Sequence, residues 1–392
     1  MNSVKAQRML IVTGEASGDL LASHLVKAMR AADPSLTVSA MGGDRLRQAG
    51  AEIIFDISRH AVMGITEVFG HLGTLYGAFR KLKRILARER PDLLILVDYP
   101  DFNLRLAGVA KKHRIPVLYY VSPQIWAWRT SRIRRIAATV SAMVVVFPFE
   151  LPLYREAGVE AHFVGHPLLD IVQVSGSREE NITRFGLQPG RRAIGLLPGS
   201  RLSEVKRILP PMLDAARRLL REHKDLQFII PVAPGLHKAD LERLSGDAGV
   251  AVTLVDNSIY DVIDSSYLVI VASGTASLET ALLAKPMVIV YRMSPLSYRI
   301  ARRLVKVPHI GMANIIAGKT VVAELIQEQA SGDRIAAEAA RLLDDAGLYG
   351  RVSAELELVK KKLGEPGASE RAARIALEML QRPPSAAEAA SE

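Results

Sequence analysis

An aspartate directly follows the strongest predicted strand in the first half of the chain. Asp98 comes after the apolar run 92–97, and Asp101 follows three residues later. A carboxylate at the end of a strand can accept the proton of an attacking hydroxyl group, whereas one just before a helix can cap its first turn. We expect a helix to begin near Phe102, so Asp101 is the predicted cap and Asp98 the predicted general base. Glu15, in an earlier turn, is the alternative base.

Two strand-to-helix turns in the second half have the composition of a phosphate site. Residues 272–279 read Ala-Ser-Gly-Thr-Ala-Ser-Leu-Glu, and residues 197–201 read Leu-Pro-Gly-Ser-Arg. Amide groups at a helix start and a guanidinium group can hold a diphosphate and stabilise charge that develops on it, although a solvated arginine is the alternative for the second turn. A glutamate one helical turn further on can accept both hydroxyls of a ribose. The candidates are Ser200, Arg201, Ser273, Gly274, Thr275, Ala276 and Glu279, with Arg201 also a catalytic candidate.

The first strand-to-helix turn and a tryptophan-rich loop are candidates for contact with a second ligand. Residues 14–19 read Gly-Glu-Ala-Ser-Gly-Asp, which is not the G-x-G-x-x-G fingerprint of dinucleotide sites. Its glycines would let a ligand approach the backbone, and a tight turn is the alternative. Residues 122–128 hold both tryptophans and precede several arginines, so they could stack bases, lie at a lipid interface or fill a loop. We favour lipid or acyl contact, and the candidates are Gly14, Ser17, Asp19, Trp126 and Trp128.

The elements that must position these residues alternate between short apolar strands and amphipathic helices. The predicted strands cover 9–13, 92–97, 117–121, 143–147 and 162–164, then 193–197, 227–231, 252–255, 268–271 and 287–291. Apolar strands that alternate with helices indicate parallel sheets covered on both faces. The chain is therefore predicted to be α/β, with two Rossmann-like domains facing each other across a cleft, where ligands meet the carboxyl ends of the strands.

A segment rich in serine, glycine and charge, 170–180, separates the two series of strands. We place the first domain at 1–169 and the second at 170–366. A helix at about 367–381 is a candidate to pack back on the first domain, and the tail 382–392 has the composition of a disordered segment.

Composition excludes several classes of protein. The chain of 392 residues has no cysteine, which excludes disulfides and cysteine-ligated metals and fits a reducing compartment. No His-Glu-x-x-His pattern occurs, and no apolar run approaches the ~20 residues that span a bilayer. We expect no signal peptide and no metal. The net charge of +10 favours an anionic partner, such as a nucleic acid, a membrane or a phosphorylated substrate.

Six segments, taken together and in this order, resemble the lipid-A-disaccharide synthase family, which is glycosyltransferase family 19. They are Gly14–Asp19, Asp98–Asn103, Ser122–Trp128, Phe163–Leu168, Leu197–Arg201 and Ser273–Thr280. The resemblance extends from about Met9 to the helix that ends near Leu380.

The resemblance implies a GT-B fold and an inverting transfer without a metal or other cofactor. The donor would be UDP-2,3-diacylglucosamine, the acceptor 2,3-diacylglucosamine 1-phosphate, and the products UDP and the lipid A disaccharide 1-phosphate. Asn314 and Gln327 match further family positions near the donor. The chain departs from the family at Ala323, where proline is usual before Glu-Leu, and this weakens the assignment of Gln327.

The acylated substrates imply an enzyme in the cytoplasm of a Gram-negative cell, in peripheral contact with the inner membrane. Residues 71–90 combine Leu72, Leu75, Phe79 and Leu82 at helical spacing with several basic residues, which suits an interfacial helix or an ordinary core-facing one. Residues 297–306 are a second basic candidate. A homodimer is left open.

Two other functions compete with this interpretation. Another GT-B enzyme, such as a UDP-sugar epimerase or the peptidoglycan glucosaminyltransferase, would share the donor chemistry. A nucleic-acid-binding protein is suggested by the positive charge alone, and no recognition motif supports it.

Overall fold

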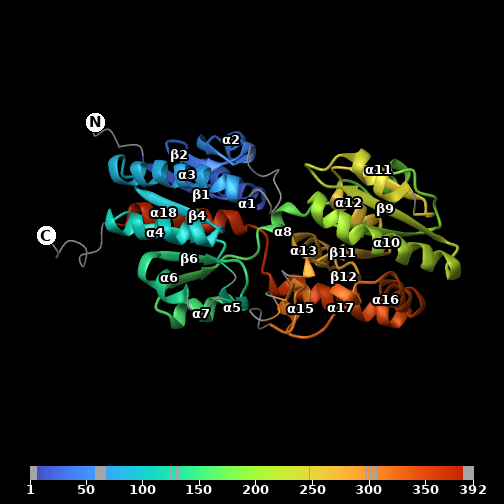
Figure 1. Cartoon of the computed structure of the whole chain (residues 1–392). Coiled ribbons are helices and arrows are strands. Elements are labelled where there is room, and N and C mark those ends of the chain that lie inside the picture. The colour runs from blue at the N-terminus through green and yellow to red at the C-terminus, as the bar shows by residue number, and fades with distance from the viewer. Residues whose placement is uncertain are drawn as a thin grey trace. The chain divides into compact units, whose positions relative to one another are not determined.

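The computed structural model describes residues 7–57, 68–123, 125–128, 132–246, 248–295, 298–299, 302 and 307–382, without the side chains of 68–72 and 127–128. The chain divides into two units, which Figure 1 shows as separate sheets with their helices. Unit 1 consists of Met1–Leu169 with Leu363–Glu392, and unit 2 of Asp170–Lys362.

Unit 1 is a parallel sheet of seven strands in the order β3-β2-β1-β4-β5-β6-β7. Its strands are β1 (Arg8–Thr13), β2 (Thr37–Gly42), β3 (Glu52–Asp56), β4 (Leu93–Val97), β5 (Val117–Tyr120), β6 (Ala142–Val145) and β7 (Glu160–Phe163). Its helices are α1 (Ala16–Ala32), α2 (Asp44–Gln48), α3 (Val68–Arg88), α4 (Pro100–Lys112), α5 (Ile125–Trp128), α6 (Ile133–Thr139), α7 (Glu150–Glu156) and α18 (Ala368–Gln381), and α8 (Leu168–Ile171) spans the divide.

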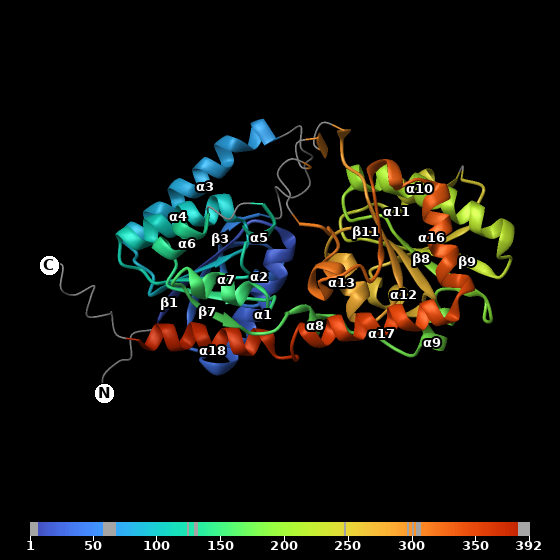
Figure 2. The same ribbon diagram turned by 90° about the horizontal axis from the view of Figure 1, so that it is seen from below.

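Alternate residues of β1 and β4 enter different cores, because successive side chains of a strand point to opposite faces. Met9 and Ile95 pack with α1 and α18 on one face, and Leu10 and Leu96 pack with α3 and α4 on the other. Helix α18, which Figure 2 shows in red beside α1, thus completes the core of unit 1 although it comes after unit 2 in the chain.

Unit 2 is a parallel sheet of six strands in the order β10-β9-β8-β11-β12-β13. Its strands are β8 (Arg192–Leu197), β9 (Leu226–Val232), β10 (Val252–Asp256), β11 (Leu268–Ala272), β12 (Met287–Tyr291) and β13 (Ala323–Ile326). Its helices are α9 (Arg178–Arg184), α10 (Leu202–Glu222), α11 (Lys238–Gly246), α12 (Ile259–Ser265), α13 (Thr275–Leu282), α15 (Met312–Ala317), the 3-10 turn η4 (Gln327–Gln329), α16 (Gly332–Asp344) and α17 (Ala346–Lys362).

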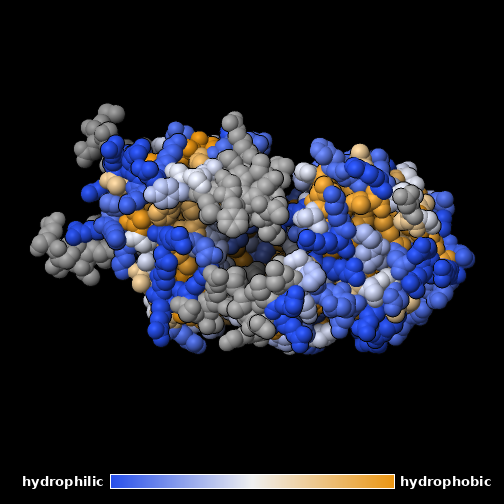
Figure 3. Space-filling view, in the orientation of Figure 1, coloured by the Kyte–Doolittle hydropathy of each residue, from blue (hydrophilic) through white to orange (hydrophobic). Residues whose placement is uncertain are grey.

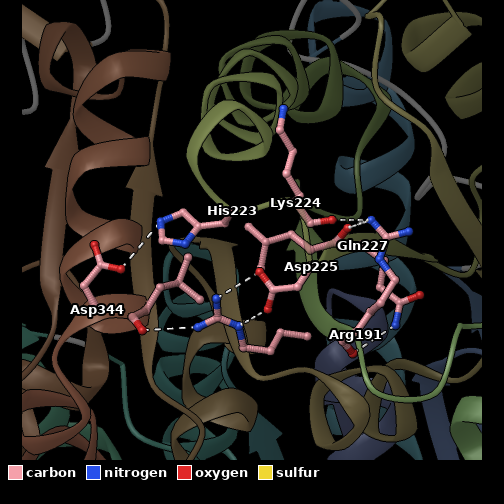
Figure 4. A network of polar contacts seen from close by, with 9 residues as sticks. Arg191, His223, Lys224, Asp225, Gln227 and Asp344 are labelled. Carbon is pink, nitrogen blue, oxygen red and sulfur yellow. Dashed lines mark hydrogen bonds and ion pairs between the residues drawn. The ribbon is translucent and has the colours of Figure 1, made fainter.

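A polar network fixes the amino edge of the unit 2 sheet (Figure 4). Arg192 donates through Nε to Asp225 at 2.6 Å and through Nη1 to the Leu343 carbonyl at 3.2 Å, while Arg191 donates to the Lys224 carbonyl at 2.8 Å. The Arg192 guanidinium lowers the pKa of Asp225. Because the pair is partly exposed, its role is to align β8, β9 and α16 more than to add stability.

The predicted parallel sheets are confirmed, but the sequence analysis missed β2, β3 and β13. Two of these are edge strands, and β3 has half-exposed side chains from Ile53 to Asp56, so its apolar signal is short.

The candidate interfacial helix at 71–90 is largely core-facing. Ala78, Leu82 and Leu86 of α3 are buried, and Phe79 packs edge-on against Phe102. Of the two alternatives left open for this segment, the burial of Leu82 supports the core-facing helix, whereas Tyr76 is 63% exposed.

Both units expose mainly hydrophilic residues on the face drawn in Figure 3, with scattered apolar areas. Within the described residues, no helix is both long enough and apolar enough to cross a membrane. Most of the second basic candidate, 297–306, and the tail from 383 lie outside the described residues.

The packing of α18 predicts the effect of shortening one of its core side chains. Met379 is 7% exposed and belongs to the core shared with α1. Met379→Ala should lower the free energy of unfolding of unit 1 by about 2–5 kcal/mol. Urea unfolding followed by tryptophan fluorescence measures this, because both tryptophans lie in unit 1.

The matched control is Arg374→Ala, since Arg374 is exposed on the same helix. It should change the unfolding free energy by no more than about 0.5 kcal/mol. Equal effects of the two variants would mean that α18 does not form part of this core.

Candidate functional site

The backbone at the end of β4 is held in a strained conformation. Asp98 and Tyr99 have φ of 47° and 48°, in the left-handed region that residues with a side chain seldom adopt. The Asp98 carbonyl accepts hydrogen bonds from Asn103 Nδ2 at 2.7 Å and from the Tyr119 hydroxyl at 2.6 Å. Because such strain persists only when the surroundings enforce it, this turn is a candidate functional position.

The two candidate bases, Asp98 and Glu15, lie close enough for their charges to interact. Burial raises the pKa of Asp98, and the Glu15 carboxylate raises it further. The strand register explains this proximity, since Thr13 of β1 is opposite Val97 of β4. A carboxylate with a raised pKa is a stronger base than an ordinary aspartate, which suits proton abstraction from a hydroxyl group.

The prediction that Asp101 caps the following helix is wrong. Helix α4 begins at Pro100, and its N-cap residue is Tyr99, without a side-chain cap. Asp101 is instead an exposed residue of the first turn, paired with Arg132. The proline allows the early start, because its fixed φ suits the first helical position and its missing N–H is not needed there.

In the first strand-to-helix turn, several candidates are occupied by structural contacts. A side chain at Gly14 would overlap the Tyr99 ring, so this glycine permits close packing. Asp19 is buried and accepts from the backbone N–H groups of Gly43 at 2.6 Å and Arg45 at 3.1 Å, which leaves it a structural role. Ser17 is exposed in the first turn of α1.

An aromatic group lies beyond the strands β5 and β6 of unit 1. Trp126 packs edge-on against Phe149 with ring centres 5.1 Å apart, and Phe149 stacks on Phe147 at 5.5 Å. Phe149 is 36% exposed, so part of this aromatic surface is available to a ligand. The side chain of Trp128 lies outside the described residues.

On unit 2, helix α13 begins directly after β11, and Gly274 is its N-cap residue. Gly274 and Thr275 are exposed and Ala276 is half-buried, and a Cβ at Gly274 would meet open space. The Ser273 N–H, however, donates to the Val290 carbonyl at 2.9 Å. This corrects the candidate cradle, because the Ser273 amide is used within the sheet.

Glu279 is half-buried on α13, one turn beyond the start of the helix. Its Oε1 accepts from the Tyr260 hydroxyl of α12 at 3.1 Å, and burial raises the pKa of the carboxyl group. A half-buried carboxylate oriented by a tyrosine is suited to accept hydroxyl groups of a ligand, since such bonds to a charged acceptor are strong.

Arg201 is the N-cap residue of α10, next to the exposed Ser200. It is 68% exposed and lies 3.5 Å from Glu204. Both Arg201 and Glu204 influence the pKa of Tyr291, so Arg201 is near the end of β12. A guanidinium at the start of a long helix favours an anionic ligand, because the helix dipole acts in the same sense.

Asn314 is structural and does not present its amide to a ligand. Its Oδ1 accepts from the N–H groups of Val321 at 2.7 Å and Val322 at 3.0 Å, and its Nδ2 donates to Glu324 at 2.7 Å and to the Val322 carbonyl at 2.9 Å. The side chain is fully buried, and these bonds use all four of its hydrogen-bonding positions. The side chain of Asn314 therefore has no hydrogen-bonding position left for the donor, and the assignment of this residue to the donor site stays a prediction.

Gln327 has a similar structural role. Its Oε1 accepts from the Met293 N–H at 2.8 Å, and its Nε2 donates to the Met293 carbonyl at 3.2 Å. Its backbone is in the left-handed region, with φ of 55°. Gln327 also lines a pocket of about 550 Å³ with Lys206, Arg207, Arg292, Met293 and Glu328. Any ligand contact of this residue would therefore be through that pocket.

The sequence analysis singled out none of Asn103, Tyr119 and Glu150 as functional residues, although all three are buried at the carboxyl edge of unit 1. The hydroxyl group of Tyr119 within an apolar run was the available signal for that residue, whereas Asn103 stands only between Phe102 and Leu104. Glu150 resembles an ordinary acid in the first turn of a helix.

Comparison with known proteins gives close matches over almost the whole chain. The family described as Lipid-A-disaccharide synthetase matches residues 9–378. Lipid-A-disaccharide synthase of Geobacter sulfurreducens is 49% identical over 380 residues, covering 97% of this chain and 99% of that protein. The enzyme of the same name from Nitrosococcus oceani is 44% identical over 376 residues, with 96% and 97% covered.

Solved structures of similar fold have much lower sequence identity. A structure of S. aureus MnaA with UDP has a TM-score of 0.65 at 14% identity, covering 97% of this chain and 99% of that one. The UDP-GlcNAc 2-epimerase of Neisseria meningitidis, bound to UDP-GlcNAc, has a TM-score of 0.64 at 12% identity, with 96% and 100% covered. CalG4, the calicheamicin glycosyltransferase, has a TM-score of 0.61 at 14% identity, with 96% and 99% covered. At these identities the likeness concerns the fold.

The saturation of Asn314 predicts a loss of stability when its side chain is removed. Asn314→Ala leaves the Val321 and Val322 amides without their acceptor, at a cost of roughly 1–3 kcal/mol for each buried group. Calorimetric unfolding should show a lower transition temperature. Hydrogen exchange should be faster at residues 312–326, whereas UDP affinity of the folded fraction should change little. A fully stable variant that no longer binds UDP would return Asn314 to the ligand-binding residues.

Proposed function

Since the chain belongs to the lipid-A-disaccharide synthetase family and is a glycosyltransferase that forms the lipid A disaccharide, we propose that its two units divide the reaction between them. The GT-B fold predicted from the sequence is confirmed by two parallel α/β sheets and by the glycosyltransferases and epimerases of similar structure. In the proposal, unit 1 binds the acceptor and supplies the base, and unit 2 binds the nucleotide part of the donor.

The observation that carries the proposal for unit 1 is the strained, half-buried Asp98 carboxylate beside Glu15. Asp98 takes the proton of the acceptor 6-hydroxyl as that oxygen forms its bond to the anomeric carbon. The bond from this carbon to the diphosphate breaks on the opposite side, so the configuration inverts and UDP leaves with the electron pair. Glu15 assists by raising the pKa of Asp98, which makes Asp98 a better proton acceptor.

In unit 2, the start of α13 and Arg201 hold the diphosphate. Gly274, Thr275 and Ala276 supply the helix N-terminus, where negative charge is favoured. Because negative charge on the diphosphate grows as the sugar bond breaks, both groups stabilise the transition state more than the bound donor. Glu279, oriented by Tyr260, accepts the ribose hydroxyls.

We further propose that both sugar substrates carry acyl chains and that the enzyme works at the cytoplasmic face of the inner membrane. Acyl contact is assigned to the aromatic group around Trp126 and Phe149, because these rings are partly exposed on the same sheet edge as Asp98. Peripheral membrane contact is assigned to the basic side of α3 near the exposed Tyr76. The proposal needs no second copy of the chain.

The direct test is incubation of the enzyme with UDP-2,3-diacylglucosamine and 2,3-diacylglucosamine 1-phosphate, followed by mass spectrometry of the lipid product. The expected product is the acylated disaccharide 1-phosphate, formed together with one UDP. Turnover of UDP-GlcNAc into its 2-epimer, with no disaccharide from the acylated pair, would contradict the proposal.

Removal of the proposed base should slow the chemical step without weakening the donor complex. Asp98→Asn should lower kcat by about 10²–10⁴-fold, the usual contribution of general-base assistance, and leave the Kd of UDP unchanged. Asp101→Asn is the control and should keep most of the activity, because Asp101 is an exposed residue in the first turn of the helix that follows Asp98. Glu279→Gln should instead raise the Kd of UDP, measured by calorimetry, and slow the chemical step much less than Asp98→Asn does. A nearly normal Asp98→Asn beside an inactive Glu15→Gln would move the base to Glu15.

The coupling between the two acids predicts a shift in the pH profile. The base must be ionised, so kcat/KM is lost as the pH falls through the pKa of Asp98. Glu15→Gln removes one of the causes that raise this pKa and should therefore move the acidic limb of the profile to lower pH. Rates measured over a pH series at saturating donor test this. An acidic limb that stays in place or moves upward would show that Asp98 is not the titrating base.

A further inference from the structure

Glu150 is a buried carboxylate at the start of α7, just beyond β6, and no step of the proposed reaction uses it. It is 1% exposed. Its Oε1 accepts from the Ser122 hydroxyl at 2.5 Å and from Trp126 Nε1 at 3.1 Å, and its Oε2 accepts from the Phe147 N–H at 3.2 Å. Two of these donors are more than twenty residues away in sequence, so Glu150 ties the segment after β5 to α7.

The tied segment is the neighbour of the Asp98 turn. Val97 of β4 is opposite Tyr120 of β5, so Asp98 and Val121 leave the sheet side by side. Val121 has φ of 64°, a left-handed conformation that is rare for a β-branched residue, and Ser122 follows it directly. The sheet thus has strained turns on two adjacent strands, and Glu150 anchors the residue after the second.

The contacts of Glu150 favour the ionised form of its carboxyl group. The Trp126 and Phe147 N–H groups can only donate, whereas the Ser122 hydroxyl can also accept, so protonation of Glu150 keeps the Ser122 contact only by reversing the direction of that bond. Burial raises the pKa of Glu150 to about 7. The titratable neighbours are Tyr154, whose pKa is raised by burial, and His166 beyond the Phe147 ring, whose pKa burial lowers to about 3.

We propose that Glu150 is a positioning residue for the acceptor. Its carboxylate fixes Ser122 and Trp126 and so holds the aromatic surface of Trp126 and Phe149 in a constant position relative to Asp98. This inference rests on the proposed acceptor site of unit 1. Removal of the carboxylate would release the indole N–H of Trp126 and loosen the turn at Val121. Binding of the acceptor would suffer first, because Ser122, Trp126 and Phe147 all belong to unit 1, whereas the proposed donor residues belong to unit 2.

The test uses the full-length enzyme with Glu150→Gln, a replacement of almost the same shape that cannot accept all three bonds. The acceptor KM should rise, and kcat/KM for the acceptor should fall about tenfold or more, with the donor KM and the Kd of UDP unchanged. A purely structural role would instead lower kcat through a smaller active fraction and leave both KM values as they are. Glu156→Gln, an exposed acid of the same helix, is the matched control and should behave as the wild type.

Tryptophan fluorescence provides an independent readout, because both tryptophans of the chain lie in the tied segment. Wild-type emission should show a transition near pH 7 as Glu150 takes up a proton. The transition should be absent in Glu150→Gln and retained in Asp98→Asn. Acrylamide quenching of Glu150→Gln at high pH should match that of the wild type at low pH.

A folded Glu150→Gln enzyme with wild-type acceptor KM, or an emission transition that survives in it, overturns the proposal. If Glu150→Gln does not fold, Ser122→Ala removes one donor only and should raise the acceptor KM without changing the donor KM, and an unchanged acceptor KM overturns the proposal equally. Failure of the proposed function is distinguishable, because the wild-type enzyme would then form no acylated disaccharide.

Discussion

The carbonyl oxygen of Asp98 accepts hydrogen bonds from two buried side chains, and the carboxyl edge of unit 1 depends on them. Asn103 and Tyr119 come from the following helix and from the neighbouring strand, so both elements fix the same turn. Without these bonds the left-handed conformation of Asp98 and Tyr99 would relax, at a gain of order 1–3 kcal/mol per residue. Relaxation would displace the Asp98 carboxylate, which lies beside Glu15, and the Tyr99 ring, which packs closely on Gly14. The interaction between the two acids is thus a consequence of backbone geometry.

In unit 2, the segments at the carboxyl edge of the sheet are held by side-chain amides that form hydrogen bonds with backbone groups. Asn314 ties α15 to the segment before β13, and Gln327 ties the end of β13 to the segment after β12. Each amide replaces the regular hydrogen bonds that loops lack, because buried backbone groups must find partners. A motif position shared across a family therefore marks either a contact or its scaffold, and only the geometry distinguishes them.

The sequence predicts the sheets of this protein better than it predicts the local geometry of the candidate site. Alternation of apolar strands and helices predicts the parallel sheets, since strands buried on both faces need apolar residues at every position. It also predicts that Asp98 and Glu15 share an edge, because both follow such strands. The left-handed turn could not be predicted, because Tyr99 does not favour that conformation and one of the two bonds that enforce the turn comes from Tyr119, 21 residues away in sequence. Glu150 was not predicted for the same reason, since the pairing of β5 with β6 is what brings it close to Ser122 and Trp126.

The position of α18 has a consequence for synthesis on the ribosome. One face of the unit 1 sheet, with Met9 and Ile95, lacks the part of its cover that α18 provides until Ala368–Gln381 have emerged, whereas unit 2 is complete once Lys362 has been made. At ~5–20 residues per second, the roughly 200 residues between Leu169 and α18 take about 10–40 s to translate. The nascent N-terminal half therefore exposes part of this apolar face during that interval, and such a surface is prone to aggregation until α18 packs on it. The part of the protein made first is the part that finishes folding last.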